Sequence, residues 1–182
     1  MDRIWKMSIL ITVIILADQF TKGMIQQSFM LGESVPIIEG FFNFTYVRNP
    51  GAAFGMGRDA PDVLRAIFFL FIPVVACFWM LFLIWKERRN NFLLCLAYSL
   101  IFAGAVGNLI DRFSLNYVVD FLDFHIGYHH FPAFNIADSS ISIAAALLIW
   151  DYFLQLRAEK NKAPVATVES IKSEEKIDSA KN

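Results

Sequence analysis

Charged residues are scarce in this sequence. Aspartate, glutamate, lysine and arginine make up 18% of its 182 residues, whereas 57% are hydrophobic and the mean hydropathy is +0.49. A soluble domain carries about 25% charged residues, so this balance excludes an ordinary soluble protein and indicates one integral to a membrane. Basic clusters interleaved with aromatic residues are also missing, and the net charge is only −1. Nothing therefore supports nucleic-acid binding.

Residues that bind metals are few. The two cysteines, Cys77 and Cys95, lie in apolar runs with no histidine near them, and we interpret them as small apolar residues. The histidines His125, His129 and His130 share one segment, but their spacing is not that of a zinc motif such as H-E-x-x-H. We therefore expect no metal site and no metal cofactor.

Four apolar runs are long enough to cross a bilayer, which takes about 20 residues. They cover residues 4–26, 63–85, 92–110 and 136–156. The first run begins like a signal peptide but lacks a small-x-small cleavage site, so we expect it to remain as a span. The segment 158–182 is rich in Lys, Glu and Ser, which predicts a disordered tail. The sequence thus predicts an all-α membrane protein whose single domain, 1–157, has four transmembrane helices.

The segment between the first two spans has a different character. Within residues 33–54, β-forming and aromatic residues alternate with Pro and Gly, which predicts a small β-element at the membrane interface. The Pro50-Gly51 turn that follows is typical of a close backbone approach.

Basic residues near the spans fall mainly on one side. That side carries Arg3, Lys6, Lys86, Arg88, Arg89, Arg157, Lys160 and Lys162. The positive-inside rule then predicts that both termini and the turn between the second and third spans are cytoplasmic.

Polar residues that are costly in lipid gather at the opposite, outer boundary. They are Asp18, Asn49, Asn108, Asp111, Arg112, Asp120, Asn135 and Asp138. Because they come from different segments yet share one depth, they indicate a single outward-facing site. Within it, Asp120 and Asp138 stand at the two ends of a short connection, and two facing carboxylates can activate water for hydrolysis.

Each polar group also has a local structural explanation. Asp18 and Lys22 are four residues apart and form an ion pair on one helical face in that interpretation. Arg112 would meet a helix C-terminus and pair with Asp111. Asn135 would be an N-cap with Asp138 as its capping-box partner. These explanations stay open at this level.

Five blocks of the sequence resemble bacterial lipoprotein signal peptidase, also called signal peptidase II. They are Asp18-Gln19-x-x-Lys22, Asn49-x-Gly51-Ala52-Ala53-Phe54, Gly104-x-x-Gly107-Asn108-x-x-Asp111-Arg112, Val118-Val119-Asp120-Phe121 and Phe134-Asn135-x-Ala137-Asp138. Each block alone is weak, but the ordered set is specific and leaves only the tail unmatched.

The resemblance implies an aspartyl endopeptidase of the bacterial inner membrane, with its active site at the periplasmic face. It implies that Asp120 and Asp138 form the catalytic dyad, a pair that residue chemistry alone does not single out. The implied site-shaping and substrate-binding positions are Asp18, Lys22, Asn49, Gly51, Gly104, Asn108, Asp111, Arg112, Asn135 and Ala137. Asp111 would orient Arg112 and its neighbours.

The implied substrate is a diacylglyceryl-modified prolipoprotein, cleaved just before its lipidated cysteine in contact with membrane lipid. We expect a monomer without metal or organic cofactor. A small transporter or channel, an aspartyl protease of the presenilin type and a non-enzymatic assembly subunit are the alternatives. A continuous polar path to the cytoplasm and a Gly-x-Gly-Asp motif, which the first two require, are both missing.

Overall fold

The computed structural model describes residues 3–51 and 61–179, with the backbone alone for residues 62 and 161–179. Its helices are α1 (Arg3–Ser28), α2 (Asp62–Ala66), η2 (Ile67–Phe71), α3 (Ile72–Glu87), α4 (Phe92–Leu115) and α5 (Ile136–Ser179). Since α2, η2 and α3 follow one another without a break, four helical segments are long and apolar enough to cross a membrane. The predicted four-span helical fold is confirmed.

The second span contains one irregularity. Pro73 lies in the middle part of this span, and the helix widens to the π-helix η2 shortly before this proline. Proline has no backbone N–H, so it cannot donate the hydrogen bond that the carbonyl one turn earlier would normally accept. A π-type turn is a common way for a helix to absorb such a defect.

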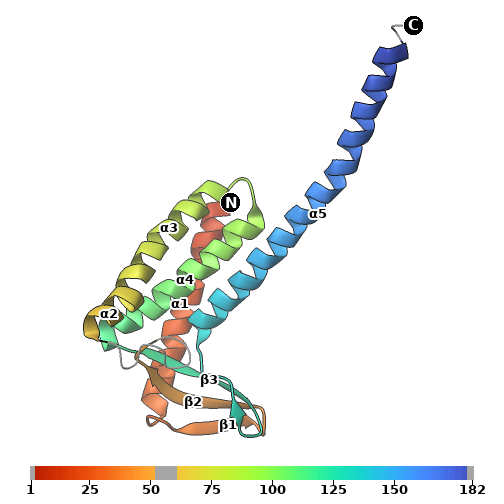
Figure 1. The fold of residues 1–182 in the computed structure, drawn as a ribbon. Helices are drawn as coiled ribbons and strands as arrows, with labels where there is room; N and C mark the ends of the chain where they lie inside the picture. Colours follow the sequence, from red (N-terminus) through yellow and green to blue (C-terminus); the bar gives the residue numbers. More distant parts are fainter. Residues whose placement is uncertain (1–2, 52–60, 180–182) are drawn as a thin grey trace.

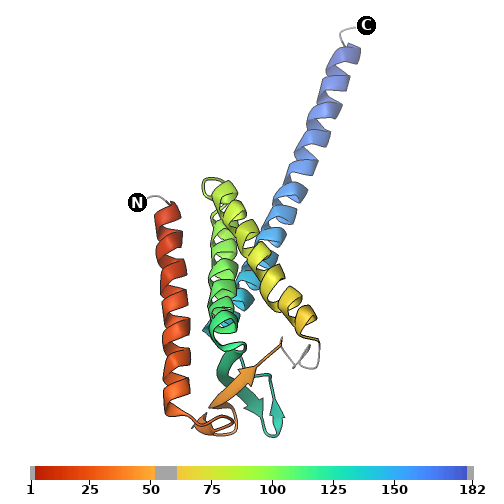
Figure 2. The same cartoon turned by 90° about the vertical axis from the view of Figure 1, so that its left-hand side faces the viewer.

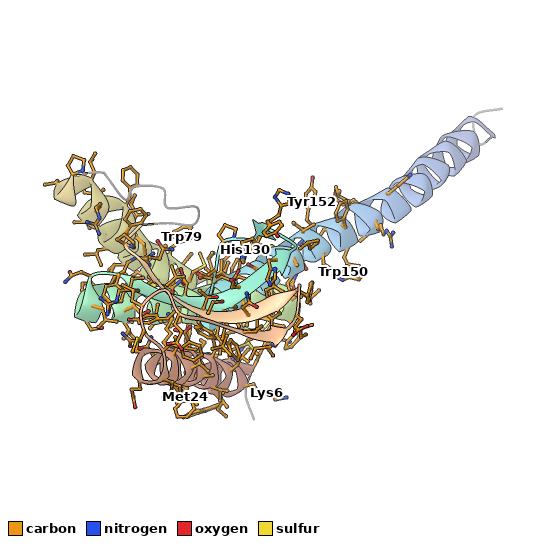
Figure 3. All side chains as sticks on the ribbon, turned by 90° about the horizontal axis from the view of Figure 1, so that it is seen from below. Lys6, Met24, Trp79, His130, Trp150 and Tyr152 are labelled. Carbon is orange, nitrogen blue, oxygen red and sulfur yellow. The ribbon has the colours of Figure 1, made fainter. Side chains whose placement is uncertain are left out.

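Helix α4 is the centre of the bundle, with α1, α3 and α5 packed around it (Figures 1 and 2). Small side chains make this possible, because Ala97 and Ala103 of α4 are fully buried. The outer faces remain apolar. In the view from the sheet end, Met24, Trp150 and Tyr152 lie at the periphery of the bundle (Figure 3), and each is more than half exposed. Such side chains suit contact with lipid.

The sheet lies at the end of the bundle opposite the N-terminus (Figure 1). Its strands are β1 (Ser34–Ile38), β2 (Phe42–Asn49), β3 (Val118–Ile126) and β4 (His129–His130), antiparallel in the order β1-β2-β3-β4. The sequence places a β-element only between the first two spans. In the structure, half of the strands come instead from the α4–α5 connection, since β2 finds its partner in β3.

Two helix ends differ from the predicted limits. α4 continues to Leu115, beyond the predicted residue 110, and ends where Asn116 adopts a left-handed conformation (φ 65°). α5 continues to Ser179 and leaves the bundle (Figure 1), whereas composition predicts a disordered tail from residue 158. The Ala, Glu and Lys residues that follow residue 157 are strong helix formers, so they extend α5 without needing a packing partner.

Candidate active site

Asp120 and Asp138 reach one place from two different elements. Asp120 lies on β3, where it is 2% exposed, and Asp138 lies in the first turn of α5. The predicted N-cap is present, because Asn135 Oδ1 accepts a hydrogen bond from the Asp138 backbone N–H at 2.9 Å. The same Asn135 also contacts the other carboxyl group. Its side chain therefore caps the start of α5 and also binds the carboxyl group of Asp120.

Amide side chains connect the two carboxyl groups. Asn135 Nδ2 donates to Asp120 Oδ1 at 2.7 Å and to Asn108 Oδ1 at 3.2 Å. Asn108 Nδ2 in turn donates to Asp138 Oδ1 at 2.7 Å. The second oxygen of Asp120 accepts a hydrogen bond from Asn49 Nδ2 at 3.0 Å. Three asparagines thus fix both carboxyl groups without neutralising their charge.

Burial changes the acidity of Asp120. Removal of the carboxylate from water, together with the neighbouring charge of Asp138, raises the pKa of Asp120 to about 7. The hydrogen bonds from Asn49 and Asn135 lower that pKa and offset part of the rise. At neutral pH Asp120 is therefore poised between the acid and the carboxylate, as acid–base catalysis requires.

Lys22 is the centre of a second group of acids, Asp18 and Asp111, next to the Asp120–Asp138 pair. Its Nζ lies 2.8 Å from Asp18 Oδ2 and 3.0 Å from Asp111 Oδ2, and it donates to Asn108 Oδ1 at 3.0 Å. All three charged side chains are at most 3% exposed. The predicted Asp18–Lys22 pair exists, but as part of a larger buried network.

The acids of this network hold the chain segments that carry the dyad. Asp18 Oδ1 accepts a hydrogen bond from the Ala137 backbone N–H at 2.9 Å, next to Asp138. Asp111 Oδ2 accepts one from the Val119 backbone N–H at 3.0 Å, next to Asp120. The prediction that Asp111 orients Arg112 is therefore not what the structure shows. Asp111 faces Lys22 because that cation and the start of β3 lie on its side of α4.

Arg112 points toward the loop after β2. Its Nη2 donates to the Gly51 carbonyl oxygen at 3.2 Å, and its guanidinium lies 5.6 Å from the centre of the Phe69 ring. Gly51 is buried and its own N–H donates to Asn49 Oδ1 at 3.1 Å. The remaining residues of that block, Ala52-Ala53-Phe54, lie outside the described residues.

A cavity of about 530 Å³ opens beside the dyad. Its polar wall consists of Asn49, Asn108, Arg112, Asp120 and Asp138. Its apolar wall comes from the residues before α5 and from the first turns of α5, among them Phe131, Phe134, Ile141 and Ile143. The cavity therefore combines a polar reacting end with a surface suited to an apolar ligand.

Gly104 and Ala137 shape the site without lining it. A Cβ on Gly104 would approach Ser140 Oγ to 2.6 Å and would also collide with the Ala137 carbonyl. This contact between α4 and α5 sets the depth of Asp138. Gln19 and Gly107 are two residues that the sequence analysis quoted but assigned no role. Gln19 Nε2 donates to Asp111 Oδ1 at 2.9 Å, and Gly107 leaves room for Asp18.

The histidines lie away from this cavity. His125 and His130 stack at 4.7 Å on the β3–β4 hairpin, and His130 Nδ1 contacts Asp123 Oδ1 at 2.8 Å. Among residues 3–51, 61 and 63–160, whose side chains are described, no cluster of three or more His, Cys, Asp or Glu side chains is arranged to hold a metal ion.

Comparison with known proteins gives one consistent result. Residues 10–154 match the family model described as signal peptidase (SPase) II. The chain is 46% identical to a lipoprotein signal peptidase of Syntrophus aciditrophicus over 149 residues, which cover 82% of this chain and 92% of that protein. It is 45% identical to the lipoprotein signal peptidase of Desulforapulum autotrophicum over 139 residues, or 76% and 86% of the two chains.

Solved structures agree with this result. One bacterial membrane enzyme superposes with a TM-score of 0.75 at 36% identity, covering 84% of this chain and 90% of that one. A second has a TM-score of 0.71 at 35% identity, with 82% and 93% covered. The family match over residues 10–154 includes part or all of each of the four spans and every sequence block described above. This chain belongs to the signal peptidase II family.

Proposed function

We propose that the protein is an aspartyl endopeptidase that removes the signal peptide from diacylglyceryl-modified prolipoproteins, with Asp120 and Asp138 as its catalytic pair. The observation that carries the assignment is the amide bridge described above, Asp120–Asn135–Asn108–Asp138, at the end of a cavity. The other acids of the region, Asp18 and Asp111, are each paired with Lys22 and do not line that cavity.

The surroundings of the two carboxyl groups suggest different roles. Asp120, whose pKa is about 7, holds the proton and donates it to the oxygen of the scissile carbonyl. Asp138 lies at the positive end of the α5 dipole and accepts a hydrogen bond from Asn108. It removes a proton from the attacking water, which adds to the carbonyl carbon. The resulting tetrahedral intermediate collapses when Asp138 passes this proton to the leaving amine and one hydroxyl of the intermediate returns a proton to Asp120, so both carboxyl groups recover their starting states. No step requires a metal or an organic cofactor.

The cavity also fits the proposed substrate. A prolipoprotein presents an apolar signal helix and acyl chains next to the bond to be cut. The apolar wall formed by Phe131, Phe134, Ile141 and Ile143 accepts such groups, while Arg112 and Asn49 face the peptide backbone. One chain supplies both carboxyl groups, so we propose that the monomer is active.

The test is cleavage of a purified diacylglyceryl-modified prolipoprotein by the purified protein in lipid. Asp120→Asn and Asp138→Asn should each lower turnover by at least about 10²- to 10⁴-fold, the usual contribution of a general acid or base. Asp123→Asn is the matched control on the same strand, because Asp123 pairs with His130 and Thr45 outside the cavity. Substantial turnover by either dyad variant would refute the assignment.

We also propose that the sheet and the dyad face the outer, periplasmic side of the bacterial inner membrane and that both termini are cytoplasmic. Arg3, Arg88 and Arg89 at the opposite end of the bundle support this orientation. In a variant lacking Cys77 and Cys95, Tyr128→Cys on the exposed hairpin should react with an impermeant maleimide in intact spheroplasts. Lys160→Cys should react only after permeabilisation, and the reverse pattern would invert the orientation.

Membership in a peptidase family favours this function over a transporter or an assembly subunit. An assembly subunit would tolerate both the Asp120→Asn and the Asp138→Asn substitution. The same cleavage assay therefore distinguishes a peptidase from an assembly subunit.

A further inference from the structure

Three arginines surround a small cavity at the end of the bundle farthest from the dyad. The cavity measures about 70 Å³ and is lined by Arg3, Ile4, Arg88 and Arg89. Arg3 belongs to the first turn of α1, whereas Arg88 and Arg89 follow α3. Figure 1 shows the start of α1 beside the α3–α4 turn, at the end of the bundle away from the sheet.

Apolar packing brings these segments together. Met7 of α1 packs with Ile84 of α3 and Cys95 of α4 in one buried cluster. This contact places the first turn of α1 against the α3–α4 turn. Arg3 is then held over the Phe92 ring, with its guanidinium carbon 5.6 Å from the ring centre. The convergence of the three cations is thus a result of the fold and not of sequence proximity.

Within the side chains that the structure describes, no carboxylate neutralises the positive charge of this cavity. Among residues 3–51 and 61–160, whose side chains are described with the exception of Asp62, no ion pair joins Arg3, Arg88 or Arg89 to a carboxylate. Nη1 of Arg3 is buried and has no hydrogen-bond partner. A buried donor without a partner is costly, and orientation by the positive-inside rule would be served equally well by arginines extended into water. The arrangement therefore fits an anion that completes it.

We propose that this cavity binds the phosphate of an anionic phospholipid in the leaflet opposite the active site. Guanidinium groups are suited to phosphate because they donate several hydrogen bonds in one plane. A lipid suits the location better than a soluble anion. Arg3 lies over the ring of Phe92 and Arg88 over that of Trp85, and both rings are about half exposed or more, as aromatic residues at a membrane boundary are. Basic pockets at helix ends bind lipid head groups in this way. The inference does not depend on the proposed function.

The experiment is native mass spectrometry of the purified full-length protein in detergent, titrated with phosphatidylglycerol and, separately, with zwitterionic phosphatidylcholine. Wild type should retain phosphatidylglycerol in preference to phosphatidylcholine. Arg88→Gln/Arg89→Gln should weaken phosphatidylglycerol binding about tenfold or more, the effect of losing charge-assisted hydrogen bonds. Arg3→Gln should act in the same direction, and Arg3→Lys should restore part of the binding because it keeps the charge.

The matched control removes the same charge at the same end of the molecule but outside the cavity. Arg157→Gln/Lys160→Gln on α5 and Lys6→Gln on α1 serve this purpose, since all three side chains are exposed. These variants should bind phosphatidylglycerol like wild type, and every variant should keep the circular-dichroism spectrum and the unfolding temperature of wild type, which verifies folding. Equal losses in cavity and control variants would overturn the proposal, as would competition by millimolar inorganic phosphate, which would identify a soluble anion as the ligand.

Discussion

Asp18, Asp111 and Asp120 are all buried carboxyl groups, but their neighbours differ. Asp18 and Asp111 lie within 3.0 Å of Lys22, which compensates their charge. Asp120 has only amide donors, so its charge remains costly and its pKa rises to about 7. Residue type alone cannot separate these acids. The position of a single lysine separates the ion-paired acids Asp18 and Asp111 from Asp120.

The pH dependence of cleavage should report the proton on Asp120. If the protonated form is required, turnover falls as pH rises through about 7, because the carboxyl group then loses its proton. The hydrogen bond from Asn49 lowers the pKa of Asp120. Asn49→Ala should therefore move this alkaline limb to higher pH while reducing the maximum rate. A pH–rate profile of both proteins measures the shift.

The control for this prediction lies on the same strand. Asn43 is opposite Asp123 in the β2–β3 register and hydrogen-bonds that residue rather than Asp120. Asn43→Ala should leave the limb in place. A limb that moves equally in both variants, or that moves to lower pH in Asn49→Ala, would contradict the role of Asn49.

The residues of the site could be predicted, but most of their partners could not. The sequence blocks named Asp111 and Arg112 together, and their adjacency favoured a pair. In the structure Asp111 pairs with Lys22 of α1 and accepts a hydrogen bond from Val119. The ion-pair partner of Asp111 depends on which face of α4 packs against α1. The spacing of residues within α4 does not predict that packing.

At the scale of elements, the sheet and the helix bundle meet through β3. The register pairs Val47 with Asp120 and Asn49 with Val118. A one-residue slip would turn Asp120 to the other face of the sheet. The sequence predicted a β-element only within residues 33–54 and not its pairing with β3, because that partner lies across two spans. The isolated bridge between Leu122 and Phe134 then returns the chain to the start of α5.

The contact between α4 and α5 should be sensitive to a single methyl group. Gly104→Ala places a Cβ 2.6 Å from Ser140 Oγ and 2.7 Å from Ile141 Cγ1, and the nearby Ala137 carbonyl cannot move independently of α5. We expect a loss of stability of about 1–3 kcal/mol from overpacking and a drop in turnover, since Asp138 moves with α5. Thermal unfolding in lipid and the cleavage assay measure the two effects.

Gly23→Ala is the matched comparison for this substitution. Gly23 is helical too, but a Cβ there would meet nothing within 4 Å. Alanine is favoured over glycine in a helix by about 1 kcal/mol, so Gly23→Ala should be neutral or stabilising. If both variants lose the same stability, the α4–α5 contact does not explain the effect.

At the scale of the whole molecule, the two ends of the bundle differ in charge. The acids of the site lie at the sheet end, and the arginines of the small cavity lie at the other. One buried acid departs from this division. Asp151 of α5 is 4% exposed and accepts hydrogen bonds from Asn91 Nδ2 at 2.7 Å and Gln155 Nε2 at 2.6 Å. Asn91 also caps α4, with its side chain accepting from Leu94 N–H at 3.2 Å. Asp151 therefore fastens α5 to the α3–α4 turn.

This anchor defines how much of α5 the enzyme needs. The family match ends at residue 154, and beyond the bundle α5 extends away from the other helices (Figure 1). A chain shortened after Lys160 keeps Asp151, Asn91 and the whole site, so its turnover and thermal stability should equal those of the full protein. A chain shortened after Ile149 loses the anchor and part of the fourth span, and it should lose both properties.

Asp151→Leu in the full chain separates the two causes, because it removes the acceptor while keeping the span. The unpaired amide of Asn91 should then cost about 1–3 kcal/mol. If the chain ending at Lys160 loses activity, the distal part of α5 contributes to catalysis through contacts outside the bundle.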